Sequence, residues 1–430
     1  MGVQELEPDC LCSILAVSNN AQKRPNTPFN CPGEADPQPE APPSAFESAP
    51  LTTPTNFVPG LAGIPATESS ISYIDGQAGV LEYRGIPIEE LAEYSTFEET
   101  AFLLLYGKLP KQSELDNFRE RLSARRALPD RLIETLRLLP GAGHPMLALQ
   151  VGVAILGMHS QRVNLKDRES MENAAIKIIG SVPSLVAAFE RARTGLDFVQ
   201  PKEGMNTAEA FLWMMSGEEP APVAVRALDA ALILHAEHTM NASTFTSRVV
   251  ASSESDPYSV VAASIGTLKG PLHGGANERV LDQLEAIGEA ENVRPWVEER
   301  LSHKGKVMGF GHRVYKTKDP RSKVLQHLGN QVFEELGETP MYELALELER
   351  VMDEKVGHKG ICPNVDFFSG LLYQKLEIPT DLFTPIFAIA RVSGYMAHWL
   401  EQMPDNRIFR PTQIYLGERE ASYVPMSERG

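Results

Sequence analysis

The chain has 430 residues, 43% of them hydrophobic and 23% charged, which is enough to bury a large core in more than one domain. Its formal net charge of −17 argues against nucleic acid or an anionic membrane as the main partner. No apolar run reaches the roughly 20 residues of a membrane helix. Of the four cysteines, Cys10, Cys12 and Cys31 lie near the N-terminus and only Cys362 lies in the rest of the chain, which is no disulfide framework, so we expect a cytoplasmic protein.

Residues 1–56 differ in composition from the rest of the chain. Eleven of the 32 prolines lie in the first 60 residues, and this region carries seven acidic residues against only Lys23 and Arg24. Such a segment buries too little apolar surface to offset the entropy of its chain. We therefore expect residues 1–56 to be a disordered, Pro-rich, acidic extension, either dispensable or used to dock a partner.

The remaining sequence predicts a short hairpin followed by helices. Residues 71–83, ISYIDGQAGVLEY, alternate in polarity around a turn at Asp75-Gly76, which is typical of a β-hairpin. Beyond it, apolar residues recur at spacings of three and four, and no βαβ alternation occurs, so we predict a mainly α fold. The predicted helices are 88–94, 97–106, 111–126, 129–139, 146–158, 169–193, 207–215, 224–238, 278–287, 294–303, 321–336, 341–356, 371–376 and 384–403. The helix at 146–158 is apolar nearly all round, as at a domain or subunit interface.

Two histidines lie beside glycines. His273 stands in LKGPLHGGANERV and His312 in GFGHRVYKTKDPR. Because glycine accepts a positive φ, we expect both histidines on sharply bent backbone at the edge of a cleft. A helix should begin after His273, and its dipole favours a neutral imidazole that donates a hydrogen bond. The alternative is that both are ordinary surface or structural histidines.

Asp366 is a candidate general base. It lies in PNVDFFSG between Val365 and two phenylalanines, a setting that raises the pKa of a carboxyl group. Read by itself, without the motif, Asp366 is better interpreted as a helix N-cap. His235 and His238 share a helix face, but no third residue follows at metal-ligand spacing. We therefore expect no metal site and a satisfied core histidine at position 235.

Five motifs in order make the chain resemble the citrate synthase family: HAEHTMNASTF, GPLHGGANE, GFGHRVYKTKDPR, PNVDFFSG and FRPTQIYLG, within a match that runs from about residue 58 to residue 417. The resemblance is to the short, dimer-type bacterial members. It implies the mainly α citrate synthase fold, with a large helical domain in two parts, 57–274 and 379–430. A smaller helical domain, 275–378, would close over the active site.

The resemblance also implies an activity, that of an acyltransferase that converts the acyl group into an alkyl group on transfer. A citrate (Si)-synthase condenses acetyl-CoA with oxaloacetate and hydrolyses citryl-CoA to citrate and CoA, the step that opens the tricarboxylic acid cycle. The implied catalytic residues are His273, His312 and Asp366. The implied oxaloacetate ligands are His238, Arg321, Arg391 and Arg410, and the implied CoA contacts are Val307, Gly309, Gly311 and Lys316.

Arg410 would come from the other subunit, so the resemblance implies a homodimer, with higher assembly left open. It implies no permanently bound cofactor and no metal, and the Pro-rich extension replaces the β-rich domain of the NADH-inhibited branch. Read from the residues alone, Arg321 could be solvated, Arg391 could form a salt bridge, and Lys316 could be a solvated loop charge.

Three alternative functions stay open. A 2-methylcitrate synthase would use propionyl-CoA, and one methylene changes selectivity by only about 1–3 kcal/mol. The others are a non-catalytic dimeric helical scaffold and a metal-dependent helical enzyme.

Overall fold

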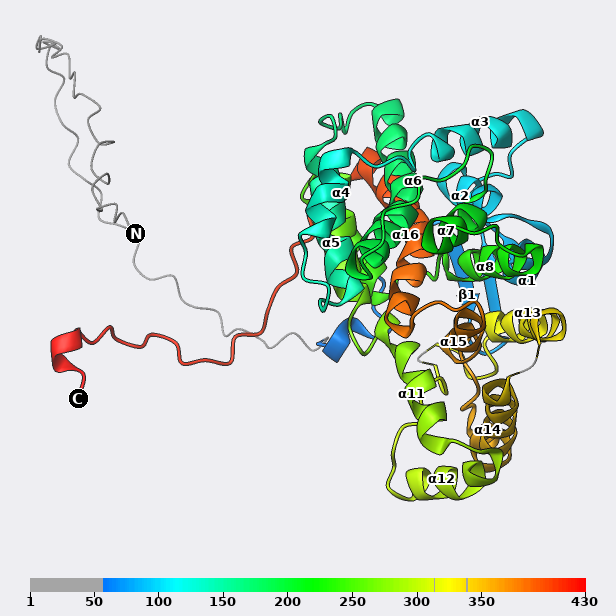
Figure 1. Ribbon diagram of the computed structural model, residues 1–430. Helices are drawn as coiled ribbons and strands as arrows, with labels where there is room; N and C mark the ends of the chain where they lie inside the picture. Colours follow the sequence, from blue (N-terminus) through cyan, green and yellow to red (C-terminus); the bar gives the residue numbers. More distant parts are fainter. Residues whose placement is uncertain (1–56, 313, 338) are drawn as a thin grey trace, which may run out of the picture. The chain divides into compact units, whose positions relative to one another are not determined.

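The computed structural model describes residues 57–430 except residues 313 and 338, so the expectation of a disordered extension at 1–56 lies outside the described residues. The described part of the chain is mostly helical, with one small sheet (Figure 1). This confirms the mainly α fold predicted from the spacing of apolar residues.

The predicted hairpin is present. Strands β1 (Ser72–Asp75) and β2 (Val80–Tyr83) pair antiparallel, with Ser72 opposite Tyr83, and the two-residue strand β3 (Ile86–Pro87) extends the sheet in the order β1-β2-β3. The turn is closed by the Asp75 carboxylate, which accepts the N–H groups of Gln77 at 2.9 Å and Ala78 at 3.0 Å. The Asp75-Gly76 signal therefore predicted the turn correctly, with Asp75 as the side chain that forms it.

Most predicted helices are found within a few residues of their expected ends. The first group is α1 (Ile88–Tyr94), α2 (Phe97–Tyr106), α3 (Gln112–Ser123), α4 (Asp130–Arg137), α5 (Pro145–Met158), α6 (Arg168–Arg193), α7 (Thr207–Ser216) and α8 (Pro222–His235). The second group is α11 (Glu278–Ile287), α12 (Ala290–Ser302), α13 (Pro320–Leu336), α14 (Pro340–Val356), α15 (Val365–Lys375) and α16 (Phe383–Gln402). The sequence analysis missed α9 (Ala242–Ser252) and α10 (Pro257–Leu268), which are rich in serine, threonine and valine and so have weak helix propensity.

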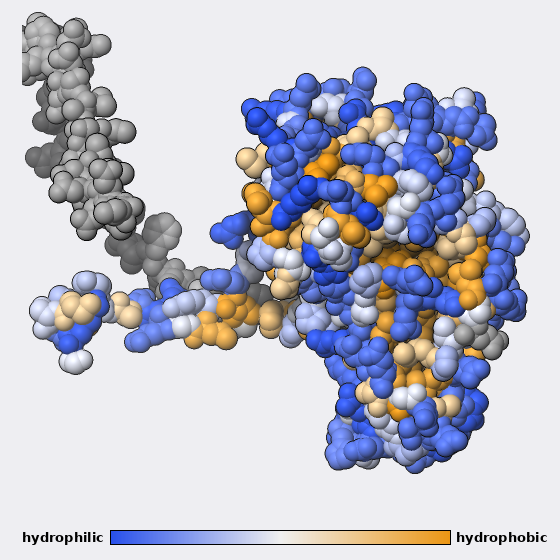
Figure 2. Space-filling view, in the orientation of Figure 1, coloured by the Kyte–Doolittle hydropathy of each residue, from blue (hydrophilic) through white to orange (hydrophobic). Residues whose placement is uncertain are grey.

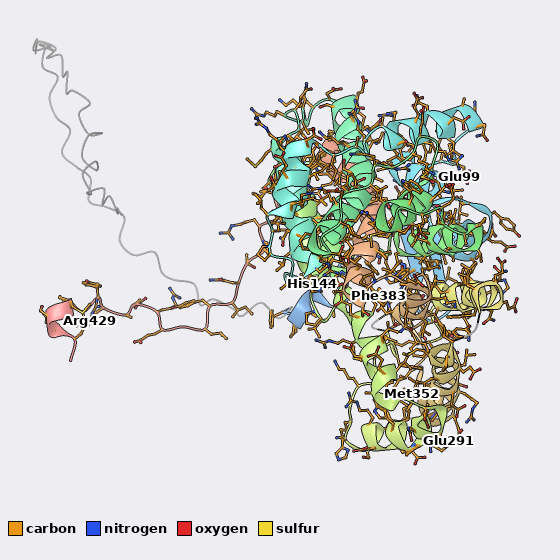
Figure 3. The ribbon with its side chains drawn as sticks, viewed as in Figure 1. Glu99, His144, Glu291, Met352, Phe383 and Arg429 are labelled. Atoms are coloured by element: carbon orange, nitrogen blue, oxygen red, sulfur yellow. The ribbon has the colours of Figure 1, made fainter. Side chains whose placement is uncertain are left out.

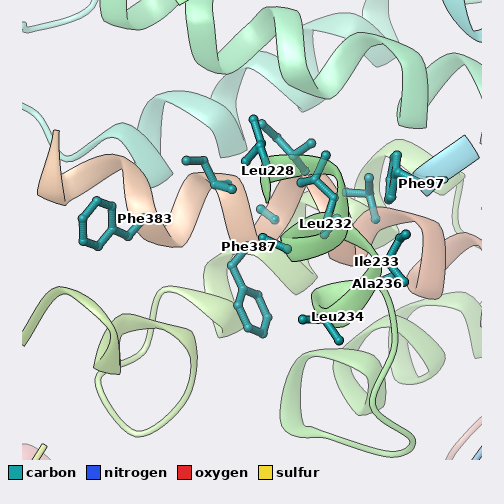
Figure 4. Packing of buried hydrophobic residues seen from close by; sticks show 14 of the residues in the cluster. Phe97, Leu228, Leu232, Ile233, Leu234, Ala236, Phe383 and Phe387 are labelled. Carbon is teal, nitrogen blue, oxygen red and sulfur yellow. The ribbon is translucent and has the colours of Figure 1, made fainter. Parts of the chain in front are cut away.

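Helix α16 lies at the centre of the core. It contacts α2, α6, α8 and α9, and nearly all of its side chains are buried. In Figure 4 the aliphatic side chains of α8, among them Leu228 and Leu232, pack beside α16, whereas the ring of Phe387 points away from them. Because α16 is fixed on several sides, it is a rigid platform for any functional side chain that it carries.

Helices α11 to α15 pack on one another, and α13 also packs on α8 and α1. Helix α11 packs against α12, α14 and α15, and α13 packs against α15 (Figure 1). Three helices meet where this group joins the rest: the carboxylate of Glu278, in the first turn of α11, lies 3.5 Å from His144 Nε2 and accepts the Thr384 hydroxyl at 2.5 Å. His144 precedes α5 and Thr384 opens α16, and Figure 3 shows His144 near Phe383.

Helix α5 is not buried on all sides within one chain. Met146, Leu149, Val153 and Leu156 are buried, but Leu147 is 47%, Val151 41% and Met158 85% exposed. These three are spaced so that they lie along one side of the helix. The apolar helix therefore has one face in the core and one uncovered apolar face.

Candidate active site

The glycines beside the two histidines have different functions. Gly309 and Gly311 have φ values of 79° and 82°, as predicted for bent backbone. Gly274 and Gly275 do not have positive φ, so that part of the expectation was wrong. They are needed for close approach instead: a Cβ on Gly274 would lie 2.7 Å from Leu268 Cδ1, and a Cβ on Gly275 would lie 2.9 Å from the Lys269 carbonyl. The His273 loop therefore packs directly on the end of α10.

His273 is neutral and contacts the start of α9. Burial, together with the charge of Arg391, lowers its pKa to about 4. Its Nε2 lies 2.8 Å from the Ser243 hydroxyl and 3.4 Å from the Ser243 backbone N–H, and the same hydroxyl lies 2.8 Å from Asn241 Oδ1. A backbone N–H can only donate, so this contact favours the tautomer that carries its proton on Nδ1, in which case the Ser243 hydroxyl donates to Nε2 and not to Asn241 Oδ1. The main cause of this lowered pKa is burial, and the effect of the helix dipole stays a prediction.

His312 has a tautomer fixed by the backbone. Its Nδ1 accepts the N–H groups of Val314 at 3.0 Å and Tyr315 at 3.1 Å, so the ring proton must be on Nε2. Burial, and next the charge of Arg321, lower its pKa to about 4. The ring lies 5.3 Å from that of His238, centre to centre. His312 is therefore a neutral donor from Nε2, a state that the sequence analysis had predicted only for His273.

Asp366 is a carboxyl group with a strongly raised pKa. Burial raises its pKa to about 7, although the charges of Arg321 and Arg391 act in the opposite direction. The alternative role as a helix N-cap is excluded, because Asn364 caps α15 by accepting the Asp366 N–H at 3.0 Å. A carboxyl group that titrates near neutral pH is suited to take up and release a proton.

Asn364 is a residue that the sequence analysis missed. Besides capping α15, its Nδ2 donates to the Gly311 carbonyl at 3.1 Å, and its N–H donates to the Gly309 carbonyl at 2.9 Å. The Gly311 N–H in turn donates to the Cys362 carbonyl at 2.8 Å. These bonds join the His312 loop to the start of the Asp366 helix. An asparagine just before an apolar helical run was the available signal.

The two buried arginines are in different states. Arg391, on α16, is 1% exposed; its Nε donates to the His235 carbonyl at 2.8 Å, and its Nη1 has no partner among the described residues. Arg321, 3% exposed, pairs with Asp319 at 2.7 Å and 3.0 Å. Neither expected alternative holds: Arg321 is not solvated, and Arg391 makes no salt bridge within the described chain. An unpaired buried guanidinium is suited to receive an anionic ligand.

The histidines on and after α8 are both buried. His238 faces His312, and its Nε2 has no partner in the described part of the chain. His235 donates from Nδ1 to the Ala231 carbonyl at 2.7 Å, but its Nε2 also has no partner among those residues, so it is only half satisfied. Phe387, which the sequence did not single out, is near three of these residues. The centre of its ring lies 4.7 Å from the ring centre of His235, 6.5 Å from that of His273 and 4.7 Å from Arg391 Cζ.

The other candidate residues differ in how they relate to this cluster, since Gly309 and Gly311 adjoin it through Phe367 and Asn364. Arg410 lies in the segment after α16 and bonds only to the Pro411 carbonyl among the described residues. Lys316 is exposed, whereas Val307 and Gly309 are buried, and a Cβ on Gly309 would lie 2.8 Å from Phe367. The structure thus brings together His238, His273, His312, Arg321, Asp366 and Arg391, but does not bring Arg410 to them.

The clustered groups are electrostatically connected. The charge of Arg391 opposes protonation of His273 and favours ionisation of Asp366, and Arg321 acts likewise on His312 and Asp366. One carboxyl group that titrates near neutrality, two neutral donors and an unpaired arginine can remove a proton from carbon, stabilise the resulting oxyanion and hold an anionic acceptor. Fold and site together are those of a helical carbon–carbon bond-forming enzyme.

Comparison with known proteins gives the family. The sequence model described as "Citrate synthase, C-terminal domain" matches residues 60–412. A citrate synthase of a Synechocystis species is 53% identical over 87% of this chain and 94% of its own length, and citrate synthase 2 of Bacillus subtilis is 44% identical over 86% and 98%. The chain belongs to the citrate synthase family, whose members are acyltransferases.

Solved structures agree with this assignment. The citrate synthase of Thermotoga maritima superposes with a TM-score of 0.78 at 40% identity, covering 86% of this chain and 99% of that one. The Thermoplasma acidophilum enzyme, solved as a ternary complex with carboxymethyl coenzyme A and oxaloacetate, gives a TM-score of 0.82 at 32% identity, with coverages of 87% and 100%. Within the described residues, no helix is both long and apolar enough to cross a membrane.

Proposed function

We propose that the chain is a citrate (Si)-synthase that condenses acetyl-CoA with oxaloacetate, with no metal ion and no resident cofactor in the reaction. The observation that carries this proposal is the pairing of a carboxyl group of pKa about 7, Asp366, with two histidines held neutral by burial. The Thermoplasma acidophilum structure, which holds a CoA derivative and oxaloacetate on the same fold, supports the choice of substrates.

The proposed reaction assigns one task to each group. The Asp366 carboxylate takes a proton from the methyl carbon of acetyl-CoA, while His273 Nδ1 donates a hydrogen bond to the thioester oxygen, where negative charge develops. The resulting enolate carbon attacks the ketone carbon of oxaloacetate, whose oxygen accepts a hydrogen bond from His312 Nε2. Water then hydrolyses the thioester of citryl-CoA, so that citrate and the CoA thiol leave.

Oxaloacetate carries two carboxylates, and the cluster offers partners for them. The unpaired Nη1 of Arg391 and the unpartnered Nε2 of His238 both lie in the buried cluster, beside Arg321. We assign these three residues and Arg410 to oxaloacetate. We assign Val307, Gly309, Gly311 and Lys316 to CoA, of which the exposed Lys316 is suited to a phosphate. Residues 275–378, which contain α11 to α15, are proposed to close over the substrates.

The test is thiol release from acetyl-CoA and from propionyl-CoA, each with and without oxaloacetate. Release that requires oxaloacetate and is faster with acetyl-CoA would support a citrate synthase. Faster release from propionyl-CoA would assign the chain to the 2-methylcitrate synthases with the same residues in the same tasks. No release from either substrate would reject the proposal. The sparse cysteines fit a cytoplasmic enzyme.

We further propose that the enzyme is a homodimer and that α5 lies in its interface. The uncovered apolar side chains Leu147, Val151 and Met158 lie on one side of α5. The segment after α16 exposes Ile408, Leu416 and Met426, and Figure 2 shows apolar surface on this segment. Both are apolar surfaces that a second copy would cover.

Introducing a charge on α5 tests this interface. Val151→Glu is expected to convert dimers into monomers, because a carboxylate would be buried against an apolar partner surface. Tyr94→Glu is the matched control, since Tyr94 is 76% exposed at the end of α1 and α1 packs on α8 and α13. Light scattering after size exclusion measures the mass of both variants. A Val151→Glu dimer as tight as the parent would place the interface elsewhere.

Subunit mixing tests whether Arg410 acts across the dimer. Arg410→Ala and Asp366→Asn chains are each expected to be nearly inactive. In a mixed dimer, one site combines the intact Asp366 of the first chain with the intact Arg410 of the second. Mixing the two inactive proteins under conditions of subunit exchange is therefore expected to restore activity. If Arg410 served the site of its own chain, every site in the mixture would lack one group and no activity would return.

A further inference from the structure

The hairpin β1–β2 contacts both segments that carry the histidines assigned to oxaloacetate. One end of the hairpin touches the turn around His238, after α8, and the other touches the loop that follows His312, before α13. In the view of Figure 1, β1 lies between α8 and α13. No catalytic group lies on the hairpin itself.

At the first end, two hydroxyl groups hold the residues on either side of His238. The Ser72 hydroxyl donates to Glu237 Oε1 at 3.0 Å and accepts the Thr239 N–H at 3.2 Å. The Tyr83 hydroxyl accepts the Glu237 N–H at 3.0 Å and donates to the Glu237 carbonyl at 2.8 Å. Ser72 and Tyr83 are direct partners in the β1–β2 register. A single cross-strand pair thus fixes both neighbours of His238.

This support is needed because the turn is strained. Thr239 has a φ of 47°, a left-handed conformation that a β-branched residue rarely adopts without being held there by its surroundings. Glu237 is fully buried, and His398 Nε2 lies 3.1 Å from its Oε1, the same oxygen that the Ser72 hydroxyl contacts. Without the Ser72 hydroxyl, the Thr239 N–H would lose its hydrogen-bond acceptor and the buried Glu237 carboxylate would lose one donor.

At the second end, the turn of the hairpin lies against the His312 loop. The Gly76 carbonyl accepts the Lys316 N–H at 2.8 Å, and a Cβ on Gly76 would lie only 2.2 Å from the Val314 carbonyl oxygen. Val314 and Tyr315 are the residues whose N–H groups bind His312 Nδ1. A shift of this loop would therefore move the donors that orient His312.

We propose that the hairpin is a positioning element that sets the placement of His238 and His312 relative to each other, with Ser72 and Gly76 as its positioning residues. This inference rests on the proposed function, since it concerns the two histidines assigned to oxaloacetate. Among the described residues, the hydrogen bonds of the His273 ring go to Ser243 and not to the hairpin, so we expect the binding of the acyl-CoA thioester at His273 to depend less on the hairpin.

The experiment compares Ser72→Ala, Ser72→Thr, Gly76→Ala and Gly85→Ala in the full-length protein. Calorimetry measures the dissociation constant of oxaloacetate without CoA, steady-state kinetics measure KM for acetyl-CoA, and thermal unfolding measures Tm. Gly85, in the β2–β3 turn, is the matched control: its φ is 83°, so alanine strains the sheet, but a Cβ there meets nothing within 4 Å.

We expect Ser72→Ala and Gly76→Ala to raise the oxaloacetate dissociation constant by about tenfold each, as for the loss of a buried hydrogen bond. KM for acetyl-CoA should stay near that of the parent, and Ser72→Thr, which keeps the hydroxyl, should restore affinity. Gly85→Ala should lower Tm without changing oxaloacetate affinity. If Gly76→Ala does not fold, Ser72→Ala and its threonine rescue decide the question.

Two results would overturn the inference. One is a Ser72→Ala protein that binds oxaloacetate as the parent does, and the other is an equal rise in KM for acetyl-CoA, which would indicate general destabilisation. Failure of the proposed function looks different, because the parent itself would then bind no oxaloacetate or would release thiol faster from propionyl-CoA.

Discussion

Asp366→Asn is expected to lower turnover by about 10²–10⁴, the range for loss of a general base, with oxaloacetate affinity nearly unchanged. The amide has nearly the shape of the carboxyl group but cannot take a proton from the methyl carbon. In the parent, kcat/KM for acetyl-CoA should rise with pH through about 7, where Asp366 ionises. If Asp366→Asn turned over at the rate of the parent, Asp366 would not be the general base.

The same substitution is expected to stabilise the folded protein at high pH. The pKa of Asp366 is about 7 in the fold against an ordinary value of 3.8, so ionisation favours the unfolded chain. This destabilisation is absent below pH 4, grows between pH 4 and 7, and is complete above pH 7. Asp366→Asn removes it, which should add on the order of 2–4 kcal/mol to the free energy of unfolding at pH 8 and nothing at pH 4.

Chemical unfolding of the parent and the variant at both pH values measures this difference. Asp130→Asn is the control, since Asp130 is an exposed carboxylate in the first turn of α4. An Asp366→Asn protein no more stable than the parent at pH 8 would show that the site does not destabilise the charged carboxylate.

His312→Ala is expected to lower turnover by about 10²–10³, the usual cost of removing one donor from a developing oxyanion. The structure predicts which replacement restores activity. The proton of His312 is on Nε2, and the amide of glutamine reaches about as far as that atom, whereas the amide of asparagine reaches only to the position of Nδ1. We therefore expect His312→Gln to be more active than His312→Asn.

Steady-state rates of the three variants, measured with saturating oxaloacetate, test this prediction. Because burial keeps His312 neutral above a pKa of about 4, its removal should leave the shape of the pH profile between 5 and 9 unchanged. Equal activity of the asparagine and glutamine variants would contradict the assigned tautomer.

Local patterns predicted most of the helices, whereas most of the clustered residues were named from the resemblance to the citrate synthase motifs, and their roles stay predictions. The spacing of apolar residues located α1, α2 and α11 to the residue. It failed at α9 and α10, where packing against each other and against α5 and α16 outweighs the low propensity of serine, threonine and valine. Glycine motifs located His273 and His312, but not whether positive φ or close packing required the glycines.

Long-range contacts could not be predicted in this way. Nothing in the sequence near Ser72 or Tyr83 indicates that their hydroxyls bind residues 237 and 239, more than 150 positions away. Phe387 likewise belongs to an apolar helix, and only the fold shows that its ring meets three polar groups. The contribution of Arg410, which would depend on a second copy of the chain, stays a prediction.

The bonds of Asn364 have a consequence for how this site tolerates movement. They join the proton acceptor on α15 and the imidazole after Gly311 into one piece of backbone, whereas Arg391 and His273 are carried by α16 and the loop before α11. A displacement between these two pieces alters how well a substrate fits, yet keeps the spacing of Asp366 and His312. Distant substitutions that shift one piece against the other should thus affect the binding of oxaloacetate at Arg391 and the stabilisation of negative charge at His273 together.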